Sequence, residues 1–413
     1  MCIRDRGNLF GQGSNPFVNV LAGVFNLFGA ISANNTNGQG GKVRMNANNI
    51  NLNSRSRIEA NGKNGGEVIL VASDTIEIQN AEVQTNGSNG RGGSISISGA
   101  QKTLFASAQI SAVGFEQGGK ILLGNDAQNG TLPFSVYSHF DEFTVINAGQ
   151  INPYSIAGGF IETSGQILGL LAAINAGRGG MWLIDPNDIF IEATEAGFIN
   201  TALNAGTNVT ISTSNATNSV GSNTISSTAG TDKIYIRSPI NATTGAATLT
   251  LNASVIELTA NVTTMGAQTY NGDVWLATNA VLTSNNGNVT ITGSVRSTVL
   301  PVVGYLSLTG AGGWAINGVA GTAVGATPTN IGAGTLAFAN GTYTWVPAYT
   351  FTSQYLVVGA GGAGGPNNGG GGGGGGVVTN TSYSVTGGTT FTMTVGGVVT
   401  LSLIHISEPT RPY

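Results

Sequence analysis

Charged side chains and cysteine are scarce in this sequence of 413 residues. Asp, Glu, Lys and Arg make up 8% of it, whereas an ordinary soluble domain carries about 25%. A single Cys and two His exclude a disulfide scaffold and leave little to bind a transition metal. The formal net charge of −4 argues against a nucleic-acid partner, because nucleic acid requires a basic surface. Val, Ile and Leu nevertheless recur throughout, and the mean hydropathy is +0.14, so the chain can bury a core.

The two ends of the sequence are related through the genetic code. The first five residues back-translate to ATG TGT ATA AGA GAC, and the six from Leu401 onward to CTG TCT CTT ATA CAC ATC, which contains the reverse complement. Both resemble the translated end of a transposase sequencing adapter, so we expect residues 1–6 and about 401–413 to be foreign to the protein. Without them the sequence has no Cys and one His, His139. We expect the rest to be an interior piece of a longer chain.

Gly-Gly pairs recur at positions 40, 65, 92 and 118, with spacings of 25, 27 and 26 residues. Apolar residues follow the first three pairs at matching offsets: two residues on (Val43, Val68, Ile95), four residues on (Met45, Leu70, Ile97) and seventeen residues on (Ile58, Val83, Ile110). Further apolar residues lie between these positions: Ile50 and Leu52, Ile76 and Ile78, and Leu104. Such alternation has the period of β-strands. A repeat of about 25 residues with three short strands is typical of a β-solenoid, in which each coil stacks on its neighbours.

The rest of residues 7–300 continues this pattern less regularly. Gly179-Gly180 is followed by Trp182 and Ile184 at the same offsets of two and four. Asn and Ser are expected to face outward or to form stacked ladders at the corners. Helical signal is confined to residues 194–203. The sequence therefore predicts an all-β fold with coils of about 25 residues.

The composition changes after residue 296. No Asp, Glu, Lys or Arg occurs between residues 297 and 400, and eight consecutive Gly occupy positions 369–376. Strands are expected at 355–358, 383–385 and 391–395. Residues 343–400 resemble the glycine-rich repeats of bacterial surface proteins and phage tail fibres. We expect the uncharged region 301–400 to be partly disordered, with 359–376 as a flexible loop.

One segment carries a more specific resemblance. Residues 179–189, with the sequence GGMWLIDPNDI, resemble a signature of filamentous-haemagglutinin-like exoproteins, and the coils over about 7–300 are similar to the same family. The resemblance implies a right-handed parallel β-helix that is secreted through an outer-membrane partner by two-partner secretion and acts in adhesion. The secretion module of that family, with its Asn-Pro-Asn-Gly type motifs, is not in this sequence.

Two motifs suggest cofactor or metal binding, and both have a simpler interpretation. Gly359, Gly361 and Gly364 match G-x-G-x-x-G after a strand, but a run of Gly follows where a dinucleotide site needs a helix and an acidic residue. His139 precedes Asp141 and Glu142, but zinc needs three or four ligands. We expect this stretch to be an exposed loop that leaves a coil.

Two charged groups could also form a site. Asp185 and Asp188 could act in acid–base chemistry or bind calcium, but the Pro between them favours corner residues with self-capping hydrogen bonds. Arg55, Arg57 and Lys63 form a small basic group that is best interpreted as a solvated face. We therefore predict no catalytic, cofactor-binding or metal-binding residues.

The repeats and the scarcity of titratable groups favour a non-enzymatic, structural role, and the resemblance implies an adhesive role on the outer surface of a Gram-negative bacterium. The expected partners are an outer-membrane secretion transporter and a surface glycan or protein receptor. No transmembrane segment is expected, because the apolar stretch at 17–30 is too short to cross a bilayer. We expect a monomeric rod. Two alternatives remain open: a polysaccharide-active β-helix enzyme, and a phage or biofilm fibre that assembles through its glycine-rich end.

Overall fold

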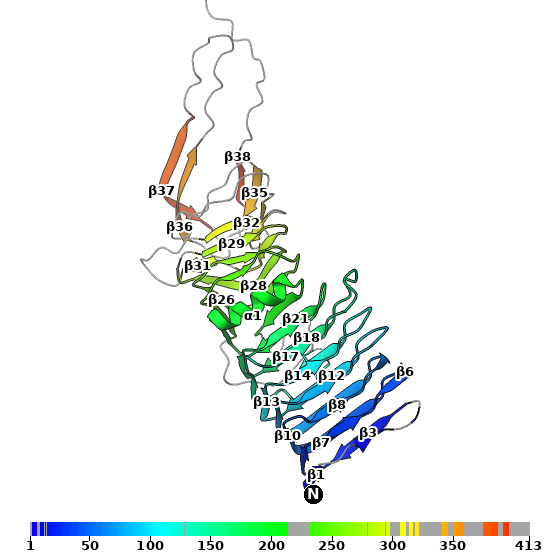
Figure 1. Ribbon diagram of the computed structural model, residues 1–413. Coiled ribbons are helices and arrows are strands. Elements are labelled where there is room, and N and C mark those ends of the chain that lie inside the picture. The colour runs from blue at the N-terminus through cyan, green and yellow to red at the C-terminus, as the bar shows by residue number, and fades with distance from the viewer. Residues whose placement is uncertain are drawn as a thin grey trace, which may run out of the picture.

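The structure is a computed structural model of the 413 residues. It describes residues 9–297 apart from 12, 14, 128, 214–231, 279 and 294. Beyond these it describes the strands at 2–5, 306–310, 314–316, 319–321, 341–345, 351–358 and 391–395, and residues 375–386. The described chain is all-β with parallel sheets, and its single helix is α1 (Ala193–Asn204). Figure 1 shows the strands stacked along one elongated axis, with α1 part-way along it.

The strands stack in three parallel ladders. The first ladder contains β3 (Phe17–Leu21), the first halves of β7 (Lys42–Leu52) and β10 (Glu67–Gln79), β12 (Ser94–Gly99), β15 (Lys120–Leu123), β18 (Phe160–Gly165), β21 (Met181–Pro186), β23 (Asn208–Ser212), the first halves of β26 (Leu249–Leu258) and β28 (Gln268–Leu276), β30 (Val289–Ile291) and β33 (Trp314–Ile316). Its inward residues stack directly on one another, as in the series Val43, Val68 and Ile95. The offsets counted from the Gly-Gly pairs therefore predicted this register correctly.

The second ladder belongs to the same 21-stranded sheet. It contains β1 (Cys2–Asp5), β4 (Val24–Leu27), the second halves of β7 and β10, β13 (Lys102–Ala106), β16 (Tyr137–Phe140) and β19 (Ile167–Leu170), and later β22 (Ile189–Ile191), β24 (Lys233–Ile236), the second halves of β26 and β28, and β31 (Val295–Ser297).

The third ladder has two parts. The first is a sheet of seven strands: β2 (Leu9–Phe10), β5 (Ala30–Ser32), β8 (Arg57–Glu59), β11 (Glu82–Gln84), β14 (Gln109–Ser111), β17 (Val145–Asn147) and β20 (Ala173–Asn175). The second is a sheet of four: β25 (Ile240–Ala242), β27 (Val262–Thr264), β29 (Ala280–Ser284) and β32 (Leu306–Gly310). Helix α1 contacts both β20 and β25, so it occupies the place of a strand between the two parts. The helix expected at 194–203 is thus confirmed and is slightly longer.

The remaining strands are short or antiparallel. Two parallel strands, β6 (Asn35–Gln39) and β9 (Gly62–Asn64), lie in the connections that lead back to the first ladder. Antiparallel pairs join β33 with β34 (Val319–Gly321), β35 (Gly341–Trp345) with β38 (Phe391–Val395), and β36 (Phe351–Val358) with β37 (Val377–Val385). The strands expected in the glycine-rich region are therefore confirmed. Most of the expected flexible loop, residues 359–374, lies outside the described residues.

One continuous core holds the ladders together. Side chains such as Leu70, Ile97 and Val83 are fully buried within a single hydrophobic cluster. The tryptophan of the signature segment belongs to this core: Trp182 stacks between Ile161 and Val209, and its indole N–H donates a hydrogen bond to Thr163 Oγ1 at 3.0 Å. Burial of these apolar rows away from water stabilises the folded stack.

Two expectations about the coils were wrong. Leu104 does not face inward; Thr103 and Phe105 do, because they stack on Ile76 and Ile78. Thr103 and Phe105 stand ten and twelve residues after the second Gly of their pair, as Ile76 and Ile78 do in the preceding repeat. The coil length also varies, since the paired residues Ile121 and Ile161 are 40 positions apart whereas Leu251 and Tyr270 are 19 apart. Insertions lengthen individual coils without disturbing the inward rows.

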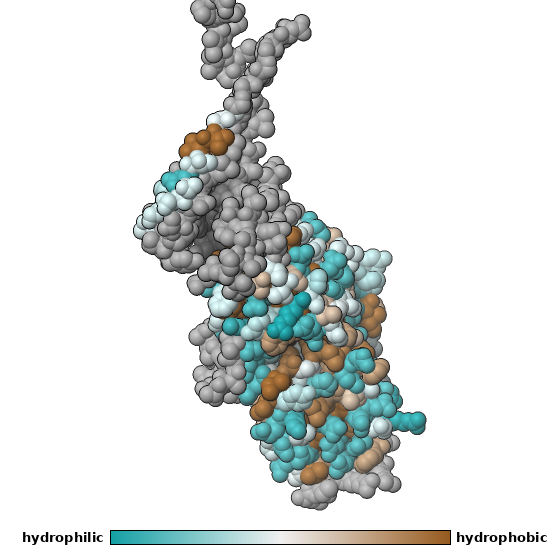
Figure 2. All heavy atoms as spheres, turned by 90° about the vertical axis from the view of Figure 1, so that its left-hand side faces the viewer, coloured by the Kyte–Doolittle hydropathy of each residue, from teal (hydrophilic) through white to brown (hydrophobic). Residues whose placement is uncertain are grey.

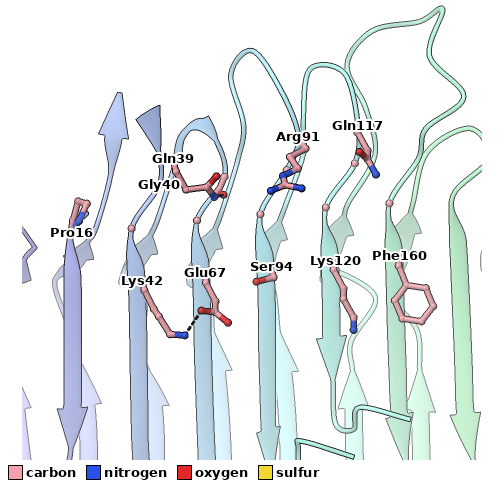
Figure 3. Close-up of a pocket in the computed structure, with 18 of the residues that line it drawn as sticks. Pro16, Gln39, Gly40, Lys42, Glu67, Arg91, Ser94, Gln117, Lys120 and Phe160 are labelled. Atoms are coloured by element: carbon pink, nitrogen blue, oxygen red, sulfur yellow. Dashed lines mark hydrogen bonds and ion pairs between the residues drawn. The ribbon is translucent and has the colours of Figure 1, made fainter. Parts of the chain in front are cut away.

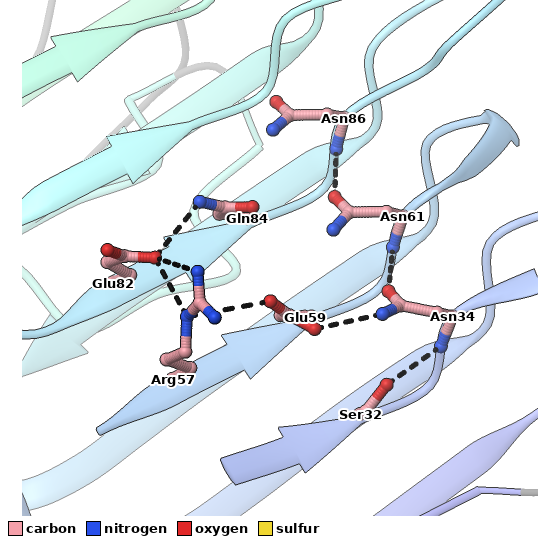
Figure 4. A network of polar contacts seen from close by, with 8 residues as sticks. All are labelled: Ser32, Asn34, Arg57, Glu59, Asn61, Glu82, Gln84 and Asn86. Carbon is pink, nitrogen blue, oxygen red and sulfur yellow. Dashed lines mark hydrogen bonds and ion pairs between the residues drawn. The ribbon is translucent and has the colours of Figure 1, made fainter. Parts of the chain in front are cut away.

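Asparagine side chains form the expected ladder at one corner (Figure 4). The Oδ1 atom of Asn34 accepts the backbone N–H of Asn61 at 2.7 Å, and Oδ1 of Asn61 accepts the backbone N–H of Asn86 at 2.7 Å. Asn86 continues the series by accepting the backbone N–H of Val113 at 2.9 Å. Each amide therefore satisfies a backbone donor of the next coil that the strand ladders leave unpaired.

Candidate functional site

A shallow groove of about 900 Å³ runs across the starts of the strands of the first ladder. Its floor is formed by the successive Gly-Gly pairs and Gly158-Gly159 (Figure 3). One wall consists of strand-start residues and the other of residues from the connecting loops. The groove crosses β3, β7, β10, β12, β15 and β18, a span of about 24 Å at ~4.8 Å per strand.

Glycine forms the floor because the backbones of neighbouring coils approach closely there. A Cβ on Gly65 would lie well inside van der Waals contact with the carbonyl oxygen of Thr85, and one on Gly93 would meet the carbonyl oxygen of Gly66. The backbone N–H of Gly93 donates to the carbonyl oxygen of Thr85 at 2.7 Å, which bridges the base of the loop between them. The repeated Gly-Gly pairs thus have a structural cause, and they leave the groove with a flat backbone floor.

The strand wall presents a row of register partners: Phe17, Lys42, Glu67, Ser94, Lys120 and Phe160. Lys42 and Glu67 form an ion pair across adjacent strands (Figure 3). The ammonium group of Lys120 lies 5.9 Å from the centroid of the Phe160 ring, a cation–π distance. Phe17 is 55% exposed at the other end of the row.

The loop wall is polar. It includes Gln39, Arg91 and Gln117, all of which are exposed. The Gln39 amide donates to the carbonyl oxygen of Gly65 in the floor, whereas Arg91 and Lys120 form no ion pair with any described residue. The groove therefore contains two cationic side chains, Arg91 and Lys120, that can bind an anionic ligand.

A second polar site, a buried carboxyl cluster, lies inside the stack. Glu162 is fully buried on β18, and its two carboxylate oxygens accept the backbone N–H of Ala127 at 3.0 and 3.2 Å. Burial, followed by the nearby charge of Asp185, raises the pKa of Glu162 to about 8. Burial also raises the pKa of Asp185 to about 7, although Asn125 opposes this by donating to its carboxylate at 3.2 Å. Among the described residues, no three acidic, His or Cys side chains are arranged to hold a metal ion.

Asp188 lies in the bend between β21 and β22 (Ile189–Ile191), whereas Asp185 does not lie at a corner, and both contact residues that are distant in the sequence. Asp185 lies in β21 and contacts Asn125, 60 positions earlier. Asp188 accepts the backbone N–H of Lys233 at 2.8 Å, 45 positions later. Both carboxylates therefore link separate coils, which local turn chemistry could not predict. The two residues do not form one paired site.

His139 is not in a loop that leaves a coil. It lies in β16, paired with Leu104 on one side and Gly169 on the other. Its ring is nearly parallel to that of Tyr137, with centroids 6.2 Å apart. The neighbouring Asp141 accepts the backbone N–H of Ser107 at 2.9 and 3.0 Å and so supports the adjacent coil.

The basic group at Arg55, Arg57 and Lys63 is a solvated face, as expected. Arg57 donates to Glu82 at 3.0 Å and also approaches Glu59 (Figure 4). The hydrogen bond and charge of Glu82 raise the pKa of Arg57. Exposed pairs of this kind contribute little to stability.

A stacked aromatic cluster on the second ladder was missed in the sequence. Phe190 and Tyr235 are register partners whose rings stack at 4.4 Å, and the Arg237 guanidinium lies 4.3 Å from the Phe190 ring centroid. Arg237 also pairs with Glu192 at 3.1 Å. The sequence did contain a signal for this cluster, since Phe190 and Tyr235 each stand between two inward Ile residues and must face outward.

Figure 2, which shows the left-hand side of Figure 1, has hydrophobic and hydrophilic residues interspersed over the stacked strands.

Comparison with known protein families matches one part of the chain. Residues 337–398 match the glycine-rich domain family. This agrees with the compositional resemblance of residues 343–400. Within it, the G-x-G-x-x-G stretch follows β36, and the next described element is the antiparallel partner β37 rather than a helix. No curated protein and no solved structure matches the chain.

Within the described part of the chain, no helix has the length and apolar character needed to cross a membrane.

Proposed function

We propose that this chain is a non-enzymatic segment of a large secreted bacterial surface protein that acts in adhesion to host cells, surfaces or other bacteria. Its stacked ladders would form a right-handed parallel β-helix of the filamentous-haemagglutinin type. The observation that carries the proposal is the continuous inward register, in which each coil of the first ladder is buried against the next. Such a rod provides length and repeated surface rather than an enclosed active site.

The distribution of charge also supports a binding role. Glu67 is the single carboxylate among the residues that line the groove, and it is held by Lys42. Glycoside hydrolysis commonly uses two carboxylates that flank the scissile bond. Glu162, in the buried carboxyl cluster, is fully buried, so a polymer cannot reach it. The described site thus favours adhesion over the alternative of a polysaccharide-active enzyme.

The proposed route places the protein on the outer surface of a Gram-negative bacterium after export through an outer-membrane transporter. The proposed receptor is a surface glycan or protein. Cys2 is the one Cys of the sequence, and it lies in the segment proposed to be foreign; a chain without it suits export through an oxidising periplasm, because it cannot be trapped by disulfides.

Adhesion can be tested directly with the purified chain coupled to beads. We expect coated beads to adhere to bacterial, epithelial or abiotic surfaces more than beads coated with the heat-unfolded chain. Equal retention of both bead types on every surface would overturn the adhesive function. Release of reducing sugars from a glycan panel would favour the enzyme instead.

A further inference from the structure

We propose that the glycine-floored groove binds a linear polysaccharide that carries carboxylate groups, and that Arg91 and Lys120 hold those carboxylates. This inference rests on the proposed adhesive function and deepens it by naming the class of ligand. The glycines only shape the floor; the two charged walls carry the argument.

The groove concentrates positive charge in a chain whose net charge is −4. Its lining contains three cations, Lys42, Arg91 and Lys120, against one carboxylate, Glu67. The Lys42–Glu67 ion pair neutralises itself, so Arg91 and Lys120 are left facing the groove (Figure 3). An anionic ligand complements this arrangement, and electrostatic complementarity favours both encounter and specificity.

The two cations stand on opposite walls, one strand apart. Arg91 lies in the loop that leads into β12, and Lys120 begins β15, the next strand of the ladder. The planar guanidinium of an arginine matches a carboxylate through two parallel N–H···O bonds, whereas a lysine acts as a point charge. The Lys120 ammonium group lies 5.9 Å from the centroid of the ring of Phe160, its neighbour in the strand wall.

The shape of the groove fits an extended chain of sugars rather than a compact ligand. It is open at the surface and spans six strands at ~4.8 Å each, a spacing close to the advance per residue of an extended pyranose chain. Ser94 and Gln117 offer hydrogen bonds to hydroxyl groups between the two cations. Phe17 and Phe160 supply apolar surface at the ends, against which the C–H face of a sugar ring can pack.

The test measures binding of the full chain to polygalacturonate, with dextran as a neutral polymer and poly-glutamate as an anionic peptide. We expect binding to polygalacturonate alone, weakened at 0.5 M salt because exposed charges are screened. The double variant R91Q/K120Q should lose affinity by about tenfold. The matched control R44Q/K102Q, which removes two exposed cations outside the groove, should bind as the unchanged chain does.

Three results would overturn the proposal. These are no binding to polygalacturonate, equal loss of affinity in both double variants, and tighter binding of poly-glutamate, which would indicate an acidic-peptide site. The bead assay run in parallel separates this proposal from the adhesive function. If R91Q/K120Q beads adhere normally while the chain does not bind polygalacturonate, only the ligand assignment fails; if unchanged beads do not adhere, the adhesive function fails.

Discussion

Glu162 and Asp185 project from adjacent parallel strands, and the charge of Asp185 adds to the burial that raises the pKa of Glu162 to about 8. The two carboxyls lie on register-paired segments, since Asp185 pairs with Ser164, two residues beyond Glu162. Ser164 donates to Glu162 at 2.9 Å, and Asn125 donates to Asp185 at 3.2 Å. These two hydrogen bonds favour the carboxylate forms, but burial outweighs them, so the pKa values of both acids lie well above their ordinary values.

This pair makes the stability of the stack depend on pH. The ordinary pKa values are 4.5 for Glu162 and 3.8 for Asp185, and the folded values are about 8 and about 7. At a pH between the ordinary and the folded pKa values, the folded state holds more protons than the unfolded state. The free energy of unfolding therefore decreases as the pH rises through this range. We expect the melting temperature to be highest at about pH 4–5 and to fall steadily toward pH 8.

The variant Glu162→Gln tests the origin of this dependence. An amide cannot ionise but can still accept the Ala127 N–H, so the variant should melt higher than the unchanged chain at pH 8 and show a flatter pH profile. A profile parallel to that of the unchanged chain would show that Glu162 does not cause the slope. The exposed substitution Glu116→Gln is the matched control and should leave the profile unchanged.

The inward row at Val68 should not tolerate charge. Val68 is fully buried between Val43 and Ile95, so Val68→Asp places a carboxylate where no partner is available. We expect a loss of at least about 3 kcal/mol in the free energy of unfolding, measured by urea denaturation. The neighbouring Ile69 faces outward and is only half-buried, so Ile69→Asp should cost clearly less. Equal losses at both positions would contradict the inward assignment.

Two glycines should respond to alanine in opposite directions. A Cβ on Gly93 would overlap the backbone of the neighbouring coil at Gly66, whereas a Cβ on Gly197 in α1 meets nothing within 4 Å. We expect Gly93→Ala to lower the melting temperature and Gly197→Ala to raise stability by up to about 1 kcal/mol, since alanine favours helix. A neutral Gly93→Ala would mean that neighbouring coils are farther apart than described.

The sequence predicted the stacking well because the repeat is local. The offsets from each Gly-Gly pair identified the buried rows of Met45, Leu70 and Ile97, since a coil of constant length places equivalent residues above one another. It failed at Leu104, because one inward position of that strand is held by the polar Thr103, while the apolar Leu104 pairs with the outward-facing Glu77.

The candidate sites were harder to predict because their residues are distant in sequence. Asn125 and Asp185 are 60 positions apart, and insertions of irregular length separate them. The groove was missed for another reason: Arg91 stands directly before a Gly-Gly pair and bridges to Gln117, the equivalent residue of the next repeat, but the repeat alone does not show that these positions line a groove. Periodicity therefore predicts the stack, whereas contacts made by insertions require the structure.

The asparagine ladder should contribute through the acceptor atom of each side chain. Asn61→Ala removes the oxygen that accepts the Asn86 N–H, leaving a partly buried backbone donor unpaired at a cost of about 1–2 kcal/mol. Asn61→Asp keeps an oxygen in the same place and should retain most of the stability at neutral pH. Thermal unfolding of the two variants distinguishes the roles. If both melt alike and well below the unchanged chain, the amide N–H₂ group rather than the oxygen stabilises this corner.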